Sequence, residues 1–220
     1  PAPITFELIE SMIAPDNYIA LSPESVALIE KCRTYLDQKI ETQVDPIYGI
    51  TTGFGSLCNR TISKEDLSQL QVNLVISHAC GIGQAVEPEI VRLMLLLKAY
   101  ALSLGNSGVQ TETVQRLLDL YNLNILPEVR QLGSLGASGD LAPLAHLVLP
   151  LLGKGKVLYQ DKWQPASEVM SQNGLSTVNL KSKGSSGSLF VPLHSAGSWR
   201  SEGYCPVCSR SYFARDKLSY

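Results

Sequence analysis

The stretch from Ile90 to Leu104 is apolar on nearly every side of a helix, with Arg92 and Lys98 as its charged residues. A helix of this composition lies in the centre of a helical protein, covered by other elements. Its two charges interrupt the run before it reaches the length of a membrane span, so we expect none here. Pro88 before the stretch and Gly105 after it are typical of a helix start and a helix end.

Other segments also show helical spacing. Ser22 and Pro23 supply an N-cap and a first-turn proline. The following helix has an apolar face at three- and four-residue steps, made of Val26, Ile29, Cys32, Leu36 and Ile40. Further helices are expected from Ser63, with Leu67, Leu70, Leu74 and His78 on one face, over 111–121, and over 166–173. Residues 156–163 could form one small β-hairpin, so the predicted class is all-α (mainly α).

Composition restricts the function. The 220 residues are 45% hydrophobic and carry a formal net charge of −2, which argues against a basic nucleic-acid groove. Residues 1–10 lack the basic start and apolar run of a signal peptide. The five cysteines are too few and too scattered for a disulfide scaffold, so we expect a cytoplasmic protein that contacts neither nucleic acid nor membrane.

The Gly- and Ser-rich segment 133–140 is the main candidate for chemistry. As a serine-hydrolase elbow with Ser138 as nucleophile it fails, because Asp140 replaces the final glycine of Gly-x-Ser-x-Gly. It lacks the Gly-Lys-Ser/Thr of a phosphate loop. Taken alone, it could also be a plain helix–helix connection capped by Asp140.

Four motifs along the chain are more specific than the segment 133–140 alone. Residues 133–146 read Gly-Ser-Leu-Gly-Ala-Ser-Gly-Asp-Leu-Ala-Pro-Leu-Ala-His. Upstream lie Tyr-Gly-x-x-Thr-Gly-Phe-Gly at 48–55, Leu-Gln-x-Asn-Leu-x-x-Ser-His-x-x-Gly-x-Gly at 70–83, and Leu-Gly-x-Ser-Gly-Val at 104–109. Together they resemble the aromatic amino acid ammonia-lyases, the family of histidine, phenylalanine and tyrosine ammonia-lyases.

The resemblance implies a self-made electrophile. In that family, Ala-Ser-Gly cyclises to 4-methylidene-imidazol-5-one (MIO), and here the residues would be Ala137, Ser138 and Gly139. Small side chains allow the close approach of backbone atoms that the cyclisation needs. Asp140 would assist the cyclisation, and Tyr48 would be the base that removes the β-proton of the substrate.

The resemblance also bears on the substrate. It assigns Ser77, His78 and Gly55 to substrate binding, with Ser77-His78 reading the ring of an aromatic amino acid. Ser-His is similar to the histidine-lyase pattern, which favours L-histidine to trans-urocanate, with L-tyrosine to trans-coumarate as the alternative. From its position on the helix alone, a core histidine is the better interpretation of His78. The family works as a homotetramer, and no metal is expected.

The resemblance extends to about residue 183. We therefore expect a truncated MIO-containing lyase region over 1–183 and a separate, irregular tail over 184–220. Such a chain could be an inactive helical fragment that acts only by association with full-length subunits. We interpret His146 as a packing residue. Cys205 and Cys208 form half of a zinc motif without a second pair, so a metal site is not predicted.

Overall fold

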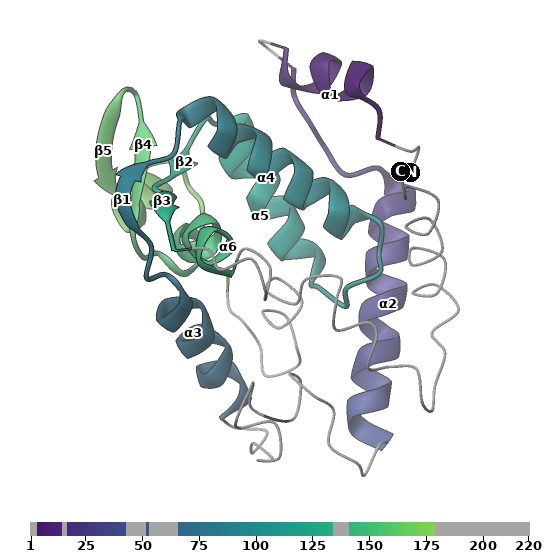
Figure 1. The fold of residues 1–220 in the computed structure, drawn as a ribbon. Coiled ribbons are helices and arrows are strands. Elements are labelled where there is room, and N and C mark those ends of the chain that lie inside the picture. The colour runs from purple at the N-terminus through teal and green to yellow at the C-terminus, as the bar shows by residue number, and fades with distance from the viewer. Residues whose placement is uncertain (1–3, 15–16, 43–51, 53–65, 134–140, 179–220) are drawn as a thin grey trace, which may run out of the picture.

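The computed structural model describes residues 4–14, 17–42, 52, 66–133 and 141–178 (Figure 1). Within them the helices are α1 (Phe6–Ile13), α2 (Pro23–Thr42), α3 (Leu67–His78), α4 (Pro88–Ser103), α5 (Thr111–Asn122), α6 (Leu141–Val148) and α7 (Ala166–Gln172), with a 3₁₀ turn η2 at Leu149–Leu152. The strands are β1 (Ile82–Ala85), β2 (Leu126–Pro127), β3 (Arg130–Leu132), β4 (Lys156–Tyr159) and β5 (Lys162–Pro165). The predicted mainly α class is confirmed.

Helix α4 is the centre of the described fold, as its composition predicts. It packs against α5 along its length and also contacts α2, α6 and β2. Leu95 and Leu96 are completely shielded from solvent, as are Leu117 and Leu120 on α5. The helix is not covered all round, however, because Ile90 and Leu97 on its outer side remain exposed.

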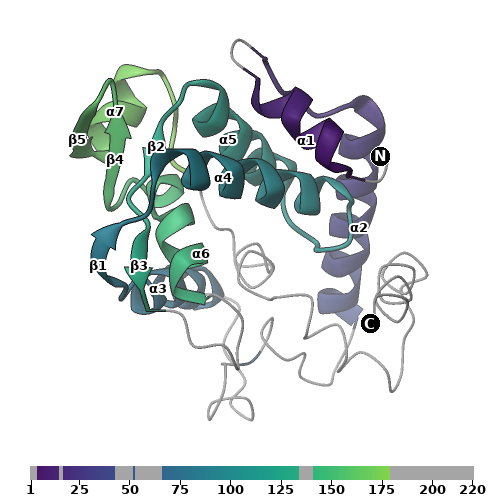
Figure 2. The same ribbon diagram turned by 45° about the horizontal axis from the view of Figure 1, so that its top comes forward.

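Helix α2 begins where its capping residues predict. The Ser22 hydroxyl accepts a hydrogen bond from the backbone N–H of Ser25 at 3.1 Å, and Pro23 is the first helical residue. Ile29, Leu36 and Ile40 are buried, which confirms the predicted apolar face. In Figure 2, α2 lies beside the ends of α4 and α5.

Helix α3 differs from the prediction. Asp66 precedes it without a side-chain cap, and the predicted start at Ser63 lies outside the described residues. Its buried residues are Gln71, Leu74 and Val75, so Leu74 of the predicted face is buried, whereas Leu70 and His78 are only half-buried. The reason is that a polar residue, Gln71, is fully buried, which a hydrophobic pattern cannot reveal.

The described part also contains more β-structure than the single predicted hairpin. That hairpin is present as β4 and β5, and both of its turn residues, Gln160 and Asp161, have positive φ. Strand β2 pairs antiparallel with β4. Strands β1 and β3 form a second, two-stranded ribbon, which the sequence does not predict.

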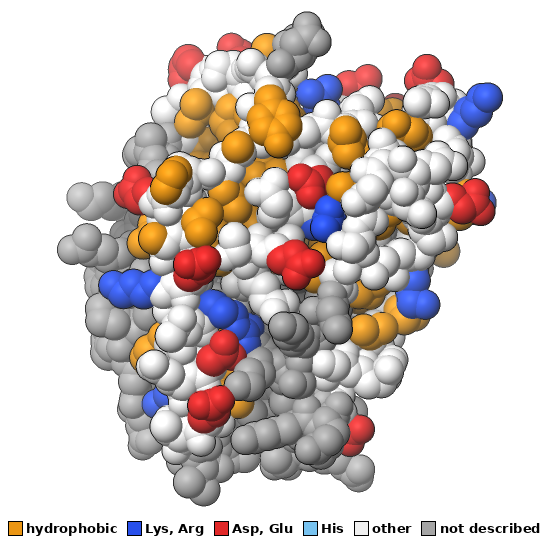
Figure 3. Space-filling view, turned by 180° about the vertical axis from the view of Figure 1, so that it is seen from behind, with side chains coloured by type: hydrophobic (Ala, Val, Ile, Leu, Met, Phe, Trp, Pro, Cys, Tyr) orange, Lys and Arg blue, Asp and Glu red, His pale blue; other side chains and the backbone are white. Residues whose placement is uncertain are grey.

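The surface mixes apolar and charged groups. On the face seen from behind in Figure 3, hydrophobic side chains gather in the upper half between scattered acidic and basic side chains. Among the described helices, none has the length and apolar composition needed to cross a membrane.

Candidate active site

The predicted ring-recognition pair lies at the C-terminal end of α3. Ser77 is exposed and His78 is half-buried. Both side chains turn back on the last helical turn: the Ser77 hydroxyl donates to the Leu74 carbonyl at 3.0 Å, and Nδ1 of His78 lies 2.8 Å from the same oxygen.

This contact decides the proton position on the neutral His78 ring. A carbonyl oxygen can only accept, so Nδ1 of His78 must be the donor. The Ser77 hydroxyl lies 3.2 Å from the same nitrogen and shares the carbonyl with it. In the neutral ring with this tautomer, Nε2 of His78 is the acceptor nitrogen.

The β1–β3 ribbon brings this end of α3 close to Gly133, the first residue of the segment 133–140. Strand β1 begins four residues after His78, and β3 ends at Leu132, directly before the segment. Ile82 pairs with Leu132. The backbones then converge further, because a Cβ placed on Gly133 would lie 2.9 Å from the Cα of Gly81. Glycine at both positions permits this close approach.

His146 provides a second link between the same parts. Its Nε2 accepts the backbone N–H of Gly81 at 3.0 Å. Burial lowers the pKa of His146; the Glu128 carboxylate and a hydrogen bond to the Glu128 backbone raise it, and the charge of Arg130 lowers it. The interpretation as simple packing is therefore incomplete, since the ring is a hydrogen-bond acceptor in its neutral form.

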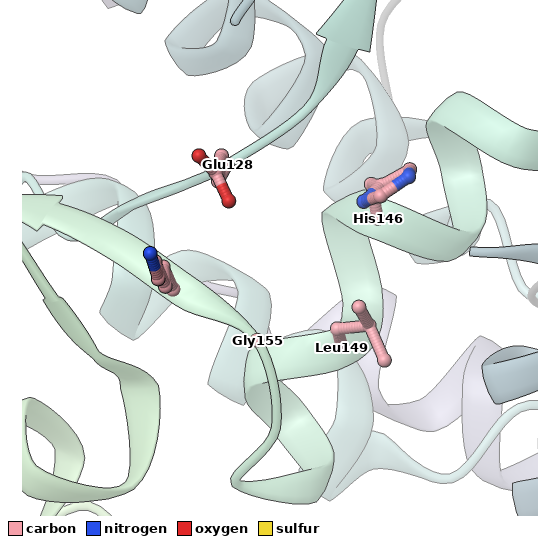
Figure 4. Close-up of a pocket in the computed structure, with 5 residues that line it drawn as sticks. Glu128, His146, Leu149 and Gly155 are labelled. Carbon is pink, nitrogen blue, oxygen red and sulfur yellow. The ribbon is translucent and has the colours of Figure 1, made fainter. Parts of the chain in front are cut away.

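The ring of His146 borders a small pocket of about 230 Å³ (Figure 4). Glu128, Leu149, Gly155 and Lys156 complete its lining. Figure 4 shows Glu128 and His146 on separate elements, with Leu149 below the histidine. The Glu128 carboxylate is also ion-paired with Arg130 at 2.8 Å.

The glycines of the 104–109 motif support the scaffold. Gly105 has φ +71°, and a Cβ there would lie 2.6 Å from the carbonyl carbon of Leu28 on α2. A Cβ on Gly108 would meet Leu36, also at 2.6 Å. Arg33 on α2 donates to the Gly108 carbonyl at 3.0 Å. The motif thus fixes the α4–α5 connection against α2.

The remaining predicted site residues, namely Tyr48, Gly55, Ala137, Ser138, Gly139 and Asp140, lie outside the described residues. Helix α6 begins at Leu141, the residue after Asp140. Within the tyrosine loop the structure describes Thr52, which is buried. The described residues hold no group of three or more His, Cys, Asp and Glu that could bind a metal, and Cys205 and Cys208 are not among them.

Comparison with known proteins identifies the scaffold. A family model described as aromatic amino acid lyase matches residues 4–187. The chain is 46% identical over 180 residues to histidine ammonia-lyase from Deinococcus radiodurans, covering 82% of this chain and 34% of that protein. It therefore spans about a third of the length of the curated relatives it matches.

Solved structures agree. Histidine ammonia-lyase from Trypanosoma cruzi superposes with a TM-score of 0.74 at 30% identity, covering 89% of this chain and 38% of that one. Tyrosine aminomutase from Streptomyces globisporus gives 0.76 at 29% identity, over 89% and 37% of the two chains. The fold of this chain is thus that of part of the helical lyase and aminomutase scaffold. The chain belongs to the aromatic amino acid lyase family.

Proposed function

We propose that this chain is the MIO-forming, ring-recognising region of an ammonia-lyase that acts on L-histidine and releases trans-urocanate. The observation that carries the proposal is the juxtaposition of the Ser77-His78 end of α3 with Gly133, where the segment 133–140 begins. Relatives named histidine ammonia-lyase support the reaction class. Assembly into a homotetramer, as in the family, and a cytoplasmic location are part of the same proposal.

Ala137, Ser138 and Gly139 have the chemistry that the electrophile requires. The unhindered nitrogen of Gly139 attacks the carbonyl carbon of Ala137, whose oxygen leaves as one water, and the hydroxyl of Ser138 leaves as the second. Asp140 assists these steps from the residue before α6. Once formed, the ring supplies an electrophile that activates the amino group of the substrate as a leaving group.

Tyr48 removes the β-proton in this proposal. A free tyrosine hydroxyl has a pKa of about 10, so the site must lower that pKa for Tyr48 to act as a base near neutral pH. Ser77 and His78 orient the substrate ring, and Gly55 also contributes to substrate binding. An acceptor Nε2 on His78 suits the N–H of an imidazole and, as the second choice, the O–H of a phenol.

Intact mass and product formation test the proposal together. Cyclisation removes two waters, so we expect a mass about 36 Da below that of the unmodified chain. Absorbance should show urocanate from L-histidine and little coumarate from L-tyrosine. The Tyr48→Phe variant should keep the lowered mass and lose turnover by about 10²- to 10⁴-fold.

A pair of serine variants provides the matched control. Ser138→Ala should have the full mass calculated for that variant, whereas Ser134→Ala in the same segment should still be about 36 Da below its calculated mass. If coumarate is the main product, the substrate is L-tyrosine and not L-histidine. An unmodified mass without product would refute the proposal for this chain and favour a fragment that acts only by association. Labelling of Ser138 by a fluorophosphonate would instead support hydrolase chemistry.

A further inference from the structure

Two different contacts connect the parts of the chain that flank the candidate site. The β1–β3 ribbon joins the residues after α3 to those before the segment 133–140. The hydrogen bond from Gly81 to His146 joins the same end of α3 to α6, which follows that segment. The ribbon is held together by backbone groups, whereas the second contact depends on the side chain of His146.

The surroundings of Gly81 are tightly packed. A Cβ on Gly81 would lie 2.8 Å from Nε2 of His146 and 2.9 Å from Cβ of Arg130. Gly81 follows the Ser77-His78 pair by only a few residues, beyond the Ala79 cap, whose N–H bonds to the Val75 and Ile76 carbonyls. The position of the Gly81 amide is therefore coupled to the end of α3.

We propose that His146 is a positioning residue: its neutral ring fixes the Ser77-His78 end of α3 against α6, and protonation of the ring releases it. That the position of the Ser77-His78 end matters for substrate binding rests on the proposed function. The contact itself does not, since it is a property of the folded chain.

The hydrogen bond from Gly81 to His146 depends on the protonation state of the imidazole ring. Nε2 accepts a proton only through its lone pair, and an imidazolium ring has two donors and no acceptor. The charged groups around the ring are Glu128 between β2 and β3, Arg130 on β3 and Lys156 on β4. From the connection between α3 and β1, the backbone amide of Gly81 faces the ring. Burial lowers the pKa of His146, which keeps the ring neutral and accepting near neutral pH.

Amide NMR of the full chain tests the proposal without using activity. In the unaltered chain, the Gly81 amide resonance should move with pH below about 6.5, following the protonation of His146, and the Ser77 and His78 amides should move with it. His146→Gln offers an uncharged acceptor, so Gly81 should keep its neutral-pH shift and lose this titration. His146→Leu should displace the Gly81 and His78 resonances at every pH.

Lys156→Gln is the matched control, because it removes a charge from the same pocket and leaves the acceptor in place. It should retain the neutral-pH Gly81 shift and its titration. An unshifted Gly81 amide in His146→Leu, or an unchanged titration in His146→Gln, would overturn the proposal. If His146→Leu fails to fold, the comparison of the unaltered chain with His146→Gln still decides. Failure to form urocanate would refute the lyase proposal while leaving this one standing.

Discussion

Two glycines with the same backbone conformation show how much close packing adds to conformational strain. Gly105 has φ +71° and Gly174 has φ +68°, so alanine is strained at either position. A Cβ on Gly105 would also collide with the backbone of Leu28, whereas nothing lies within 4 Å of a Cβ on Gly174. We expect Gly174→Ala to lower the free energy of unfolding by about 1 kcal/mol and Gly105→Ala by about 3 kcal/mol or more.

Urea unfolding followed by far-ultraviolet circular dichroism would measure both values. The difference between the two variants isolates the contact of the α4–α5 connection with α2. Equal losses for the two glycines would mean that this connection can move away from α2 at little cost.

Lys98 makes the stability of the chain depend on pH. Burial on α4 lowers the pKa of Lys98 from 10.5 to about 8. Unfolding therefore binds a proton between about pH 8 and 10.5, and in this window the free energy of unfolding rises with pH. Below about pH 8 Lys98 is charged in both states, and its burial penalty is fully present.

Lys98→Met should therefore raise the free energy of unfolding by about 1–3 kcal/mol at pH 7. The gain should shrink as pH rises from 8 towards 10.5. Lys162→Met, at an exposed position on β5, is the control and should show no such trend. A gain for Lys98→Met that is independent of pH would contradict the burial argument.

Single residues also show how far the candidate site can be predicted. Ser77 and His78 stand out because they belong to a motif, and the structure places both at one helix end. The contribution of His146 is not predictable, because its partner is a backbone amide 65 positions away. A hydrogen bond from a backbone amide to a side chain does not require a particular residue type at the amide. Here the sequence shows it only through the glycine at position 81, which makes room for the ring.

At the level of elements, local signals explain most successes. Ser22 and Pro23 mark the start of α2, and Gly174 marks the end of α7 through its left-handed conformation. The β1–β3 ribbon has no comparable signal. Its strands are four and three residues long, and the paired residues are 45 and 50 positions apart in the chain. Such pairing is set by tertiary structure, so local patterns miss it.

The turn of the β4–β5 hairpin can be made more stable by substitution. Its two turn residues, Gln160 and Asp161, have φ of +51° and +59°, the conformation of a type I′ turn. Asn-Gly prefers this turn, and both positions are exposed. The double variant Gln160→Asn, Asp161→Gly should therefore raise the free energy of unfolding by about 0.5–1 kcal/mol.

Thermal and urea unfolding of that variant would show the gain. Ser171→Gly in the exposed part of α7 is the control for glycine itself and should lower stability by about 1 kcal/mol. A loss of stability in the hairpin variant would mean that Gln160 or Asp161 makes a contribution beyond the turn.

For the whole molecule, one buried cluster connects distant elements. It includes Ile29 on α2, Leu74 on α3, Leu117 on α5 and Val157 on β4, and extends to Val178. The helical part and the β4–β5 hairpin therefore share a core, although α1 has no buried residue and Phe6 is 83% exposed. A shared core predicts that the described part unfolds as one cooperative unit.

Trp163 on β5 makes this testable, because fluorescence reports the hairpin while circular dichroism reports the helices. The second of the two tryptophans, Trp199, should first be replaced by phenylalanine so that Trp163 is the sole reporter. Both probes should then give the same urea midpoint. Leu117→Ala, which empties part of the core on α5, should lower the free energy of unfolding by about 2–5 kcal/mol and shift both probes equally. If the fluorescence midpoint stayed in place while the helical signal moved, the hairpin would be a separate folding unit, and the buried cluster would not couple it to α5.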